Sequence, residues 1–305
     1  MNWRIKALLQ KALATVPRGK SVYYLLQRSL GGFRRLNIDN RLRDAMRLVE
    51  LLAEAGVDIT GKTVVEIGSG WVPIVPTYLY ILGTERCISY DLNRYLKGAL
   101  IRQMLDQFGP HIDEIVSACP ERDLEIRDRY AKLAATEGAD DALRILQVDY
   151  RAPVDARQTG LHDGSVDVLF SNLVLEHVPP SVIEGLFCEA RRILRRNGGM
   201  MIHRVDPGDH FHSFDRTITQ INFLRYPQRS WRFWGQNDIL YQNRLRAPQY
   251  RQIAERAGFR VVSEHCKVDL RSKEALMAFP LDAEFAGFDP DELCTVTYDF
   301  VAEPT

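Results

Sequence analysis

The sequence predicts an α/β fold in which a doubly wound, largely parallel sheet is covered by helices on both faces. Short apolar runs alternate with longer amphipathic segments over most of the 305 residues, which is typical of alternating strands and helices. The run at 63–67 is rich in β-branched residues and leads into a glycine turn at 68–70, as expected for a central strand of a parallel sheet. A composition of 46% hydrophobic and 26% charged residues supports a sizeable core.

The N-terminal part, residues 1–60, is predicted to be a helical section with breaks near 17–19 and 31–32. Its last helix is expected at 39–56, where apolar residues recur at helical spacing. Residues 1–31 are basic and amphipathic, so we expect them to pack on the rest of the protein as a helical cover. Peripheral contact with a membrane surface is the alternative. No apolar run approaches the roughly 20 residues that a membrane-spanning helix needs, so no spanning segment is expected.

The remaining residues, 61–305, are predicted to form the sheet domain. Six strands are expected after the first, at 87–90, 144–148, 166–171, 200–205, 259–264 and 294–302. Between them we expect a helical run ending near 82 and helices at about 96–108, 180–197 and 248–257. Two stretches interrupt the alternation: a polar helical insertion at 111–143 and an aromatic segment at 206–248, called the lid segment below.

Acidic side chains stand at the ends of the predicted strands. Asp91 follows the second strand, 21 residues after Gly70, where a carboxylate can accept hydrogen bonds from both hydroxyls of a ribose. Val72 stands where a dinucleotide fingerprint has its third glycine, and Glu66 inside the first strand would repel a pyrophosphate. A cofactor with a positive charge and an amino-acid tail therefore suits this site better than NAD.

Taken together, these stretches resemble the class I S-adenosylmethionine-dependent methyltransferases of the small-molecule type, over roughly residues 60–302. The resemblance is carried by residues 64–70, 91, 148–150, 165–172, 175–178 and 192–199. It implies S-adenosyl-L-methionine as the cofactor. It also implies a Rossmann-like sheet of about seven strands, whose last strand is antiparallel and inserted between strands five and six.

The resemblance further implies roles for residues at the strand ends. The glycine turn faces the methionine part of the cofactor, Asp91 holds the ribose, and Asp149 meets the adenine amino group. Residues 171–173 border the methionine end. The cofactor-binding candidates are Glu66, Gly68, Ser69, Gly70, Asp91, Leu92, Asp149, Tyr150 and Asn172.

The densest cluster of candidate catalytic residues follows strand five, at 203–215. A hydroxyl acceptor must lose its proton during methyl transfer, and histidine often takes that part. His210 or His212 can act as the base with Asp206 or Asp209 orienting it, and we favour His210. His177, after strand four, is either an alternative base or a hydrogen-bonding residue at a helix start. The cluster also holds possible metal ligands, but they have no regular spacing, so no metal is expected.

The favoured function is O-methylation of a small molecule such as a glycan or a specialised metabolite. Forty basic and forty acidic residues cancel, which leaves no overall field to attract nucleic acid. Five scattered cysteines without a C-x-x-C pair favour a reducing, cytoplasmic setting. An RNA or protein methyltransferase and a non-catalytic cofactor-binding subunit are the alternatives, and the oligomeric state is open.

Overall fold

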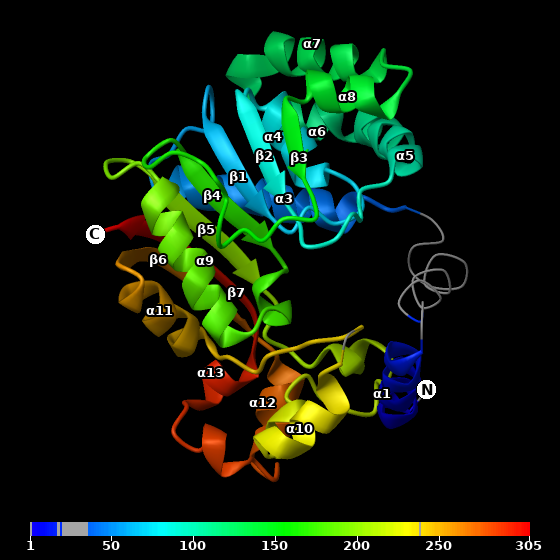
Figure 1. Cartoon of the computed structure of the whole chain (residues 1–305), viewed down its shortest axis with the longest axis vertical. Helices are drawn as coiled ribbons and strands as arrows, with labels where there is room; N and C mark the ends of the chain where they lie inside the picture. The colour runs from blue at the N-terminus through cyan, green and yellow to red at the C-terminus, as the bar shows by residue number, and fades with distance from the viewer. Residues whose placement is uncertain (1, 17–18, 20–35, 238) are drawn as a thin grey trace.

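The computed structural model describes residues 2–16, 19, 36–237 and 239–305. Within these residues, seven strands form one sheet in the order β3-β2-β1-β4-β5-β7-β6 (Figure 1). Neighbouring strands from β3 to β5 pair in parallel, whereas β7 is antiparallel to both β5 and β6. This confirms the doubly wound sheet and the antiparallel last strand between strands five and six. The strands are β1 (Thr63–Ile67), β2 (Arg86–Tyr90), β3 (Val148–Arg151), β4 (Val168–Asn172), β5 (Met200–Val205), β6 (Phe259–Val268) and β7 (Thr295–Pro304).

The helices cover both faces of the sheet. In Figure 1, α9 and α11 lie in front of the sheet and α3 lies behind it. Consecutive strand residues point to opposite faces, so Val64 packs against α3 and α4 while Val65 packs against α9 and α11. The α-helices of the described residues are α1 (Trp3–Thr15), α3 (Asp39–Glu54), α4 (Ile74–Ile81), α5 (Gly98–Phe108), α6 (Ile112–Ala118), α7 (Asp123–Ala134), α8 (Ala139–Ile145), α9 (Pro180–Ile193), α10 (Gln228–Gly235), α11 (Ala247–Arg256), α12 (Leu270–Leu276) and α13 (Pro290–Cys294).

The third strand begins later than the sequence predicts. Arg144 and Ile145, assigned to a strand at 144–148, instead form the end of α8. Gln147 then takes a φ of 53°, in the left-handed region, and the chain turns into β3 at Val148. A short apolar run suits the end of a helix and a buried strand equally well, so its pattern alone does not separate the two. Residues 265–293 also differ from the prediction. The sequence predicts no helix there, whereas the structure has α12 and α13.

The lid segment and the N-terminal helix share an apolar cluster with residues 276–294. Trp3, 4% exposed, packs its ring against Phe211 and Trp234, with ring centroids 5.3 and 5.5 Å apart. Its main-chain N–H donates to Asp215 over 3.0 Å. Figure 1 shows α1, α10, α12 and α13 gathered below the sheet. The described part of the basic N-terminal segment therefore packs on the lid segment.

The other side of α1 leaves Ile5, Leu8 and Leu9 exposed. Residues 17–18 and 20–35, which include the predicted breaks near 17–18 and 31–32, lie outside the described residues. Peripheral membrane contact through 1–31 therefore stays a prediction. No helix among the described residues is long and apolar enough to cross a membrane.

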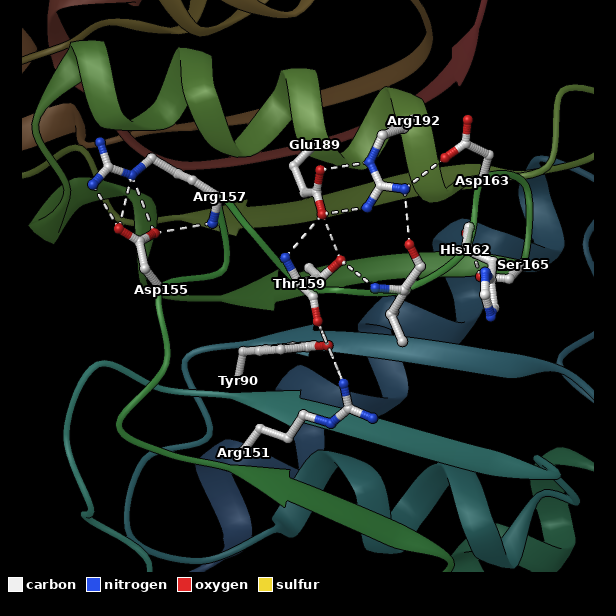
Figure 2. Close-up of polar contacts among 11 residues, drawn as sticks. Tyr90, Arg151, Asp155, Arg157, Thr159, His162, Asp163, Ser165, Glu189 and Arg192 are labelled. Carbon is white, nitrogen blue, oxygen red and sulfur yellow. Dashed lines mark hydrogen bonds and ion pairs between the residues drawn. The ribbon is translucent and has the colours of Figure 1, made fainter.

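A chain of polar contacts ties the loop between β3 and β4 to α9 and β2 (Figure 2). Glu189 on α9 accepts hydrogen bonds from the N–H and the hydroxyl of Thr159, at 2.9 and 2.5 Å. The Thr159 carbonyl accepts one from the Tyr90 hydroxyl at 2.8 Å, and Arg151 donates to the same Tyr90 oxygen at 2.9 Å. These contacts hold the ends of β2 and β3 beside Asp91, the next residue after β2.

Candidate active site

The glycine turn after β1 needs two residues without side chains. Gly68 has a φ of 84° and Gly70 a φ of 63°, both in the left-handed region that glycine adopts without strain. A Cβ on Gly68 would lie 2.5 Å from a methyl group of Val174, so the turn passes close to the segment after β4. The N–H of Gly70 donates to the carboxylate of Asp91 over 3.4 Å. The turn and the end of β2 thus meet at the carboxyl edge of the sheet, where ligands bind in doubly wound folds.

Two acids at this edge have raised pKa values. Burial raises the pKa of Glu66 to about 8, and a hydrogen bond from the Ser89 hydroxyl opposes the rise only in part. Burial also raises the pKa of Asp91, against hydrogen bonds from the main-chain N–H groups of Asn93 and Gly70. Both carboxyls are therefore held in surroundings that favour a ligand able to donate hydrogen bonds or bring positive charge.

Asp149 and Tyr150 lie further from this edge than the predicted strand implied. Because β3 runs on to Arg151, which pairs with Tyr90, Asp149 is two residues inside the strand. Its carboxylate contacts Arg86 and Arg151, both at 2.8 Å, and these guanidinium groups lower its pKa. Tyr150 uses its hydroxyl to donate to the carbonyl of Asn93, which fixes the loop after Asp91. The structure thus joins Asp91 to the glycine turn and leaves Asp149 in an ion pair.

Leu92 and Asn172 are the remaining two cofactor-binding candidates. Leu92, 64% exposed, presents an apolar side chain next to Asp91. Asn172, the last residue of β4, donates to Asp44 over 3.4 Å, while its Oδ1 is buried with no hydrogen-bond partner among the described residues. Leu173 follows with a φ of 56°, a strained backbone for a side chain of its size. The end of β4 therefore combines backbone strain with an acceptor that lacks a donor.

Three of the five catalytic candidates, His177, His210 and Asp206, come together. His177 ends the short 3₁₀ helix η3 (Leu175–His177), and His210 begins a second one, η4 (His210–Ser213). Their rings meet edge to face with centroids 5.0 Å apart. The Nε2 of His210 lies 3.4 Å from the carboxylate of Asp206. Glu176, which is not among the site residues predicted from the sequence, completes the group from a buried position.

The pKa values in this group are strongly shifted. Burial raises the pKa of Glu176 to about 8, although His210 opposes the shift. Crowding by protein atoms lowers the pKa of His177 to about 4, and His210 adds to the effect. Burial lowers the pKa of His210 too, but Asp206, Glu176 and Asp209 together raise it above the ordinary value. Such shifts gather at sites of proton transfer or ligand binding.

Asp209 and His212 are engaged inside the lid segment instead. Asp209 accepts hydrogen bonds from the N–H of Phe211 at 2.9 Å and from the side chain of Asn222 at 3.2 Å. His212 contacts the carbonyl of Ile218 at 2.7 Å through Nδ1. Both residues shape the turn that presents His210.

The site residues predicted from the sequence do not include Asp44 and Glu176. Asp44 reaches the edge from α3, where it accepts from Asn172 and pairs with Arg204 at 3.0 Å. Nothing in the spacing of the N-terminal section signals this contact. The sequence around Glu176 does indicate a site residue, since an acid next to His177 in an otherwise apolar stretch is unusual after a buried strand.

Known proteins and protein families share features with this chain. A family model described as a methyltransferase domain matches residues 37–264. No curated protein matches the chain. Among solved structures, an S-adenosylmethionine-dependent methyltransferase from Mesorhizobium loti is 15% identical, with a TM-score of 0.46 over 84% of this chain and 95% of that one.

Two further solved structures show similar levels of likeness. The PH0226 protein from Pyrococcus horikoshii is 14% identical, with a TM-score of 0.49 over 93% of this chain and 99% of that one. Geranyl diphosphate C-methyltransferase from Streptomyces coelicolor is 14% identical, with a TM-score of 0.45 over 86% of this chain and 80% of that one. The family match itself spans well over half of the chain, and the protein belongs to the class I S-adenosylmethionine-dependent methyltransferases.

Proposed function

We propose that this methyltransferase acts on a hydroxyl oxygen of a small molecule. The observation that carries the proposal is the group formed by His177, His210, Glu176 and Asp206 beside the turns that follow β4 and β5. Transfer to an alcohol oxygen requires removal of a proton whose pKa lies far above neutrality. Imidazole and carboxylate groups next to the cofactor edge are the side chains suited to that step.

The residues at the sheet edge fit S-adenosylmethionine. The cofactor supplies an electrophilic methyl group on a sulfonium. We assign the ribose to Asp91, the amino-acid tail to the turn at 68–70, and an apolar contact with the adenine ring to Leu92. The buried Oδ1 of Asn172 lacks a donor among the described residues, which suits an ammonium group. Glu66 and Ser69 line the turn, and Tyr150 supports the loop after Asp91 from β3. We assign the adenine amino group to Asp149.

His210 is the residue we assign to the acceptor hydroxyl. In the simplest mechanism, the imidazole of His210 takes the hydroxyl proton, and Asp206, 3.4 Å away, orients the ring. His177 lies edge to face with it and is the alternative base. Asp209 and His212 act on this pair only by shaping the lid segment.

The acceptor is assigned to the small-molecule class on the character of the lid segment. Described residues of the lid segment pack with α1 in an apolar cluster rich in aromatic side chains, which suits a cover for a sugar-like or flat acceptor. We assign residues 1–60 and 206–248 to substrate enclosure and 61–305 as a whole to the methyltransferase domain. The net charge of zero gives no overall electrostatic field that would attract RNA. A glycan or specialised metabolite is therefore the favoured acceptor.

Labelled methyl transfer tests this proposal. The protein is incubated with methyl-labelled S-adenosylmethionine and with cell extracts separated by size and charge. We expect label in a small-molecule fraction. Label in an RNA or protein fraction would establish one of the alternative acceptors, and label in no fraction would favour a non-catalytic cofactor-binding subunit.

Substitution at His210 tests the residue assignment. His210→Ala should lower kcat by about a hundredfold or more, with cofactor affinity nearly unchanged. His162→Ala, an exposed histidine in the turn before β4, is the matched control and should keep full activity. Full kcat in His210→Ala would remove that residue from catalysis, and loss in His177→Ala alone would move the role there.

A further inference from the structure

The group beside the acceptor position has the composition of a metal site. Glu176 and His177 come from η3 after β4, and His210 comes from η4 after β5. One ligand atom from each of the three residues lies within 4.8 Å of the other two. The residues come from segments far apart in the sequence, which explains why no regular ligand spacing is visible there.

Glu176 and His210 each bury a side-chain atom that lacks a hydrogen-bond partner among the described residues. The Oε2 of Glu176 and the Nε2 of His210 have no hydrogen-bond partner among the described residues, and Glu176 is only 1% exposed. Asp206 lies near His210 Nε2 at 3.4 Å, but without the alignment of a hydrogen bond. A buried polar atom without a hydrogen-bond partner destabilises the folded protein. One cation between Glu176 and His210 would satisfy both atoms at once.

The third ligand is held in the protonation form that metal binding needs. The Nδ1 of His177 lies 2.9 Å from the carbonyl oxygen of Tyr241. Because a carbonyl only accepts, Nδ1 must carry the ring proton, and Nε2 keeps its lone pair. Metal-bound histidines are commonly oriented in this way, with the far ring nitrogen donating to a carbonyl or carboxylate. The exposed side of His177 also leaves a path for an ion to enter.

The ligand set indicates the class of ion and leaves room for a substrate. Two imidazoles and one carboxylate suit first-row transition cations such as zinc, iron, cobalt or manganese better than calcium or magnesium, which prefer oxygen ligands alone. Three protein ligands also leave at least one coordination position open, as in catalytic rather than structural sites. An alcohol oxygen can occupy that position.

We propose that Glu176, His177 and His210 bind a divalent transition-metal cation that holds the hydroxyl oxygen of the methyl acceptor. The catalytic part of this inference rests on the proposed function, whereas the binding part does not. When the oxygen binds the cation, its O–H bond breaks, the electron pair stays on oxygen, and the proton passes to the Asp206 carboxylate and on to solvent. His210 is then a ligand and not the base. The inference reverses the sequence-based expectation that no metal is required.

Cobalt binding tests the site without any assay of activity. The whole protein is stripped with a chelator and titrated with Co²⁺, whose visible absorption reports nitrogen and oxygen ligands, and Zn²⁺ is then added to displace it. We expect one ion per chain. Glu176→Gln and His177→Ala should each weaken binding by about a hundredfold or more, since even outer-sphere changes cost ten- to a hundredfold. His162→Ala should bind like the wild type.

The outcomes separate this inference from the proposed function. No saturable Co²⁺ binding, or unchanged affinity in correctly folded Glu176→Gln and His177→Ala proteins, would overturn the metal site. Methyl transfer at full rate by stripped enzyme would overturn the catalytic part and leave O-methylation standing. Metal binding at these residues without transfer to any hydroxyl would leave the site standing and remove the proposed function. Loss of transfer on stripping, restored by Zn²⁺ or Mn²⁺ but not in Glu176→Gln, is the result we expect.

Discussion

The main-chain N–H of Gly70 donates to the carboxylate of Asp91 across 3.4 Å, which joins the turn after β1 to the end of β2. A second main-chain N–H, that of Asn93, donates to the other carboxylate oxygen at 2.8 Å. The acid is thus held in place by backbone groups and needs no movement to meet a ligand. This relationship makes Asp91 the first residue to test for cofactor binding.

Asp91→Ala should weaken binding of S-adenosylmethionine and S-adenosylhomocysteine by about 1.5–3 kcal/mol, because charge-assisted hydrogen bonds to the ribose are lost. Isothermal titration calorimetry measures the change. Asp141→Ala, which removes an exposed aspartate paired with Arg144 on α8, is the matched control. Equal affinities in the Asp91 variant and the wild type would remove Asp91 from the site.

Gly68→Ala should destabilise the protein for two separable reasons. Alanine at a φ of 84° is strained by about 1–2 kcal/mol, and its Cβ would also meet Val174 at 2.5 Å. Gly160→Ala, at a φ of 70° with nothing within 4 Å, carries the strain alone. We therefore expect a lower melting temperature for Gly68→Ala than for Gly160→Ala in thermal unfolding. Adding Val174→Ala to Gly68→Ala should restore part of the lost melting temperature. Equal losses in both single variants would contradict the close approach of these two segments.

Glu66 should make the stability of the cofactor-free protein fall as pH rises. Its pKa of about 8 in the folded state lies above the ordinary value of 4.5, so the folded state holds a proton that the unfolded state has released between these limits. The free energy of unfolding should then fall by up to about 1.4 kcal/mol per pH unit in this window and level off above it.

Glu66→Gln removes this proton linkage while keeping the shape of the side chain. The melting temperature of the variant, relative to wild type, should rise from pH 5 to pH 8. Glu121→Gln, at an exposed position, controls for the substitution itself. If the melting temperatures of the variant and the wild type changed in parallel from pH 5 to pH 8, Glu66 would be ionised in the folded protein.

Trp3→Ala should destabilise the chain by about 3–5 kcal/mol, as expected for loss of a buried aromatic side chain. Trp3 joins α1 to the lid segment through Phe211, Trp234 and the bond to Asp215. Ile5→Ala on the exposed side of α1 is the control and should change little. Chemical denaturation measures both. A near-zero effect at Trp3 would show that α1 does not hold the lid segment.

Much of the sheet could be predicted because its strands are short, apolar and bounded by turn residues. The strands at 63–67 and 200–205 have the same bounds in the structure as in the sequence analysis. The third strand could not be placed, since packing of α8 and the left-handed turn at Gln147 decide where it starts. Local pattern does not contain that information.

The candidate site divides in the same way. Gly70 and Asp91 could be foreseen together, because the carboxyl ends of neighbouring parallel strands meet at one edge. The approach of Glu176 to His210 could not be foreseen, because it depends on how the irregular lid segment folds back after β5. Asp44 was missed for a similar reason, since the orientation of α3 on the sheet is set by tertiary packing.

The most direct test of the account is the chemical identity of the methylated atom. The protein is supplied with S-adenosylmethionine carrying carbon-13 in its methyl group, and the labelled product is isolated and examined by carbon-13 NMR. We predict a methoxy carbon on a small molecule, formed by wild type and strongly reduced in His210→Ala. A signal from an N-methyl or C-methyl group, or a methoxy carbon formed equally well by both proteins, would contradict it.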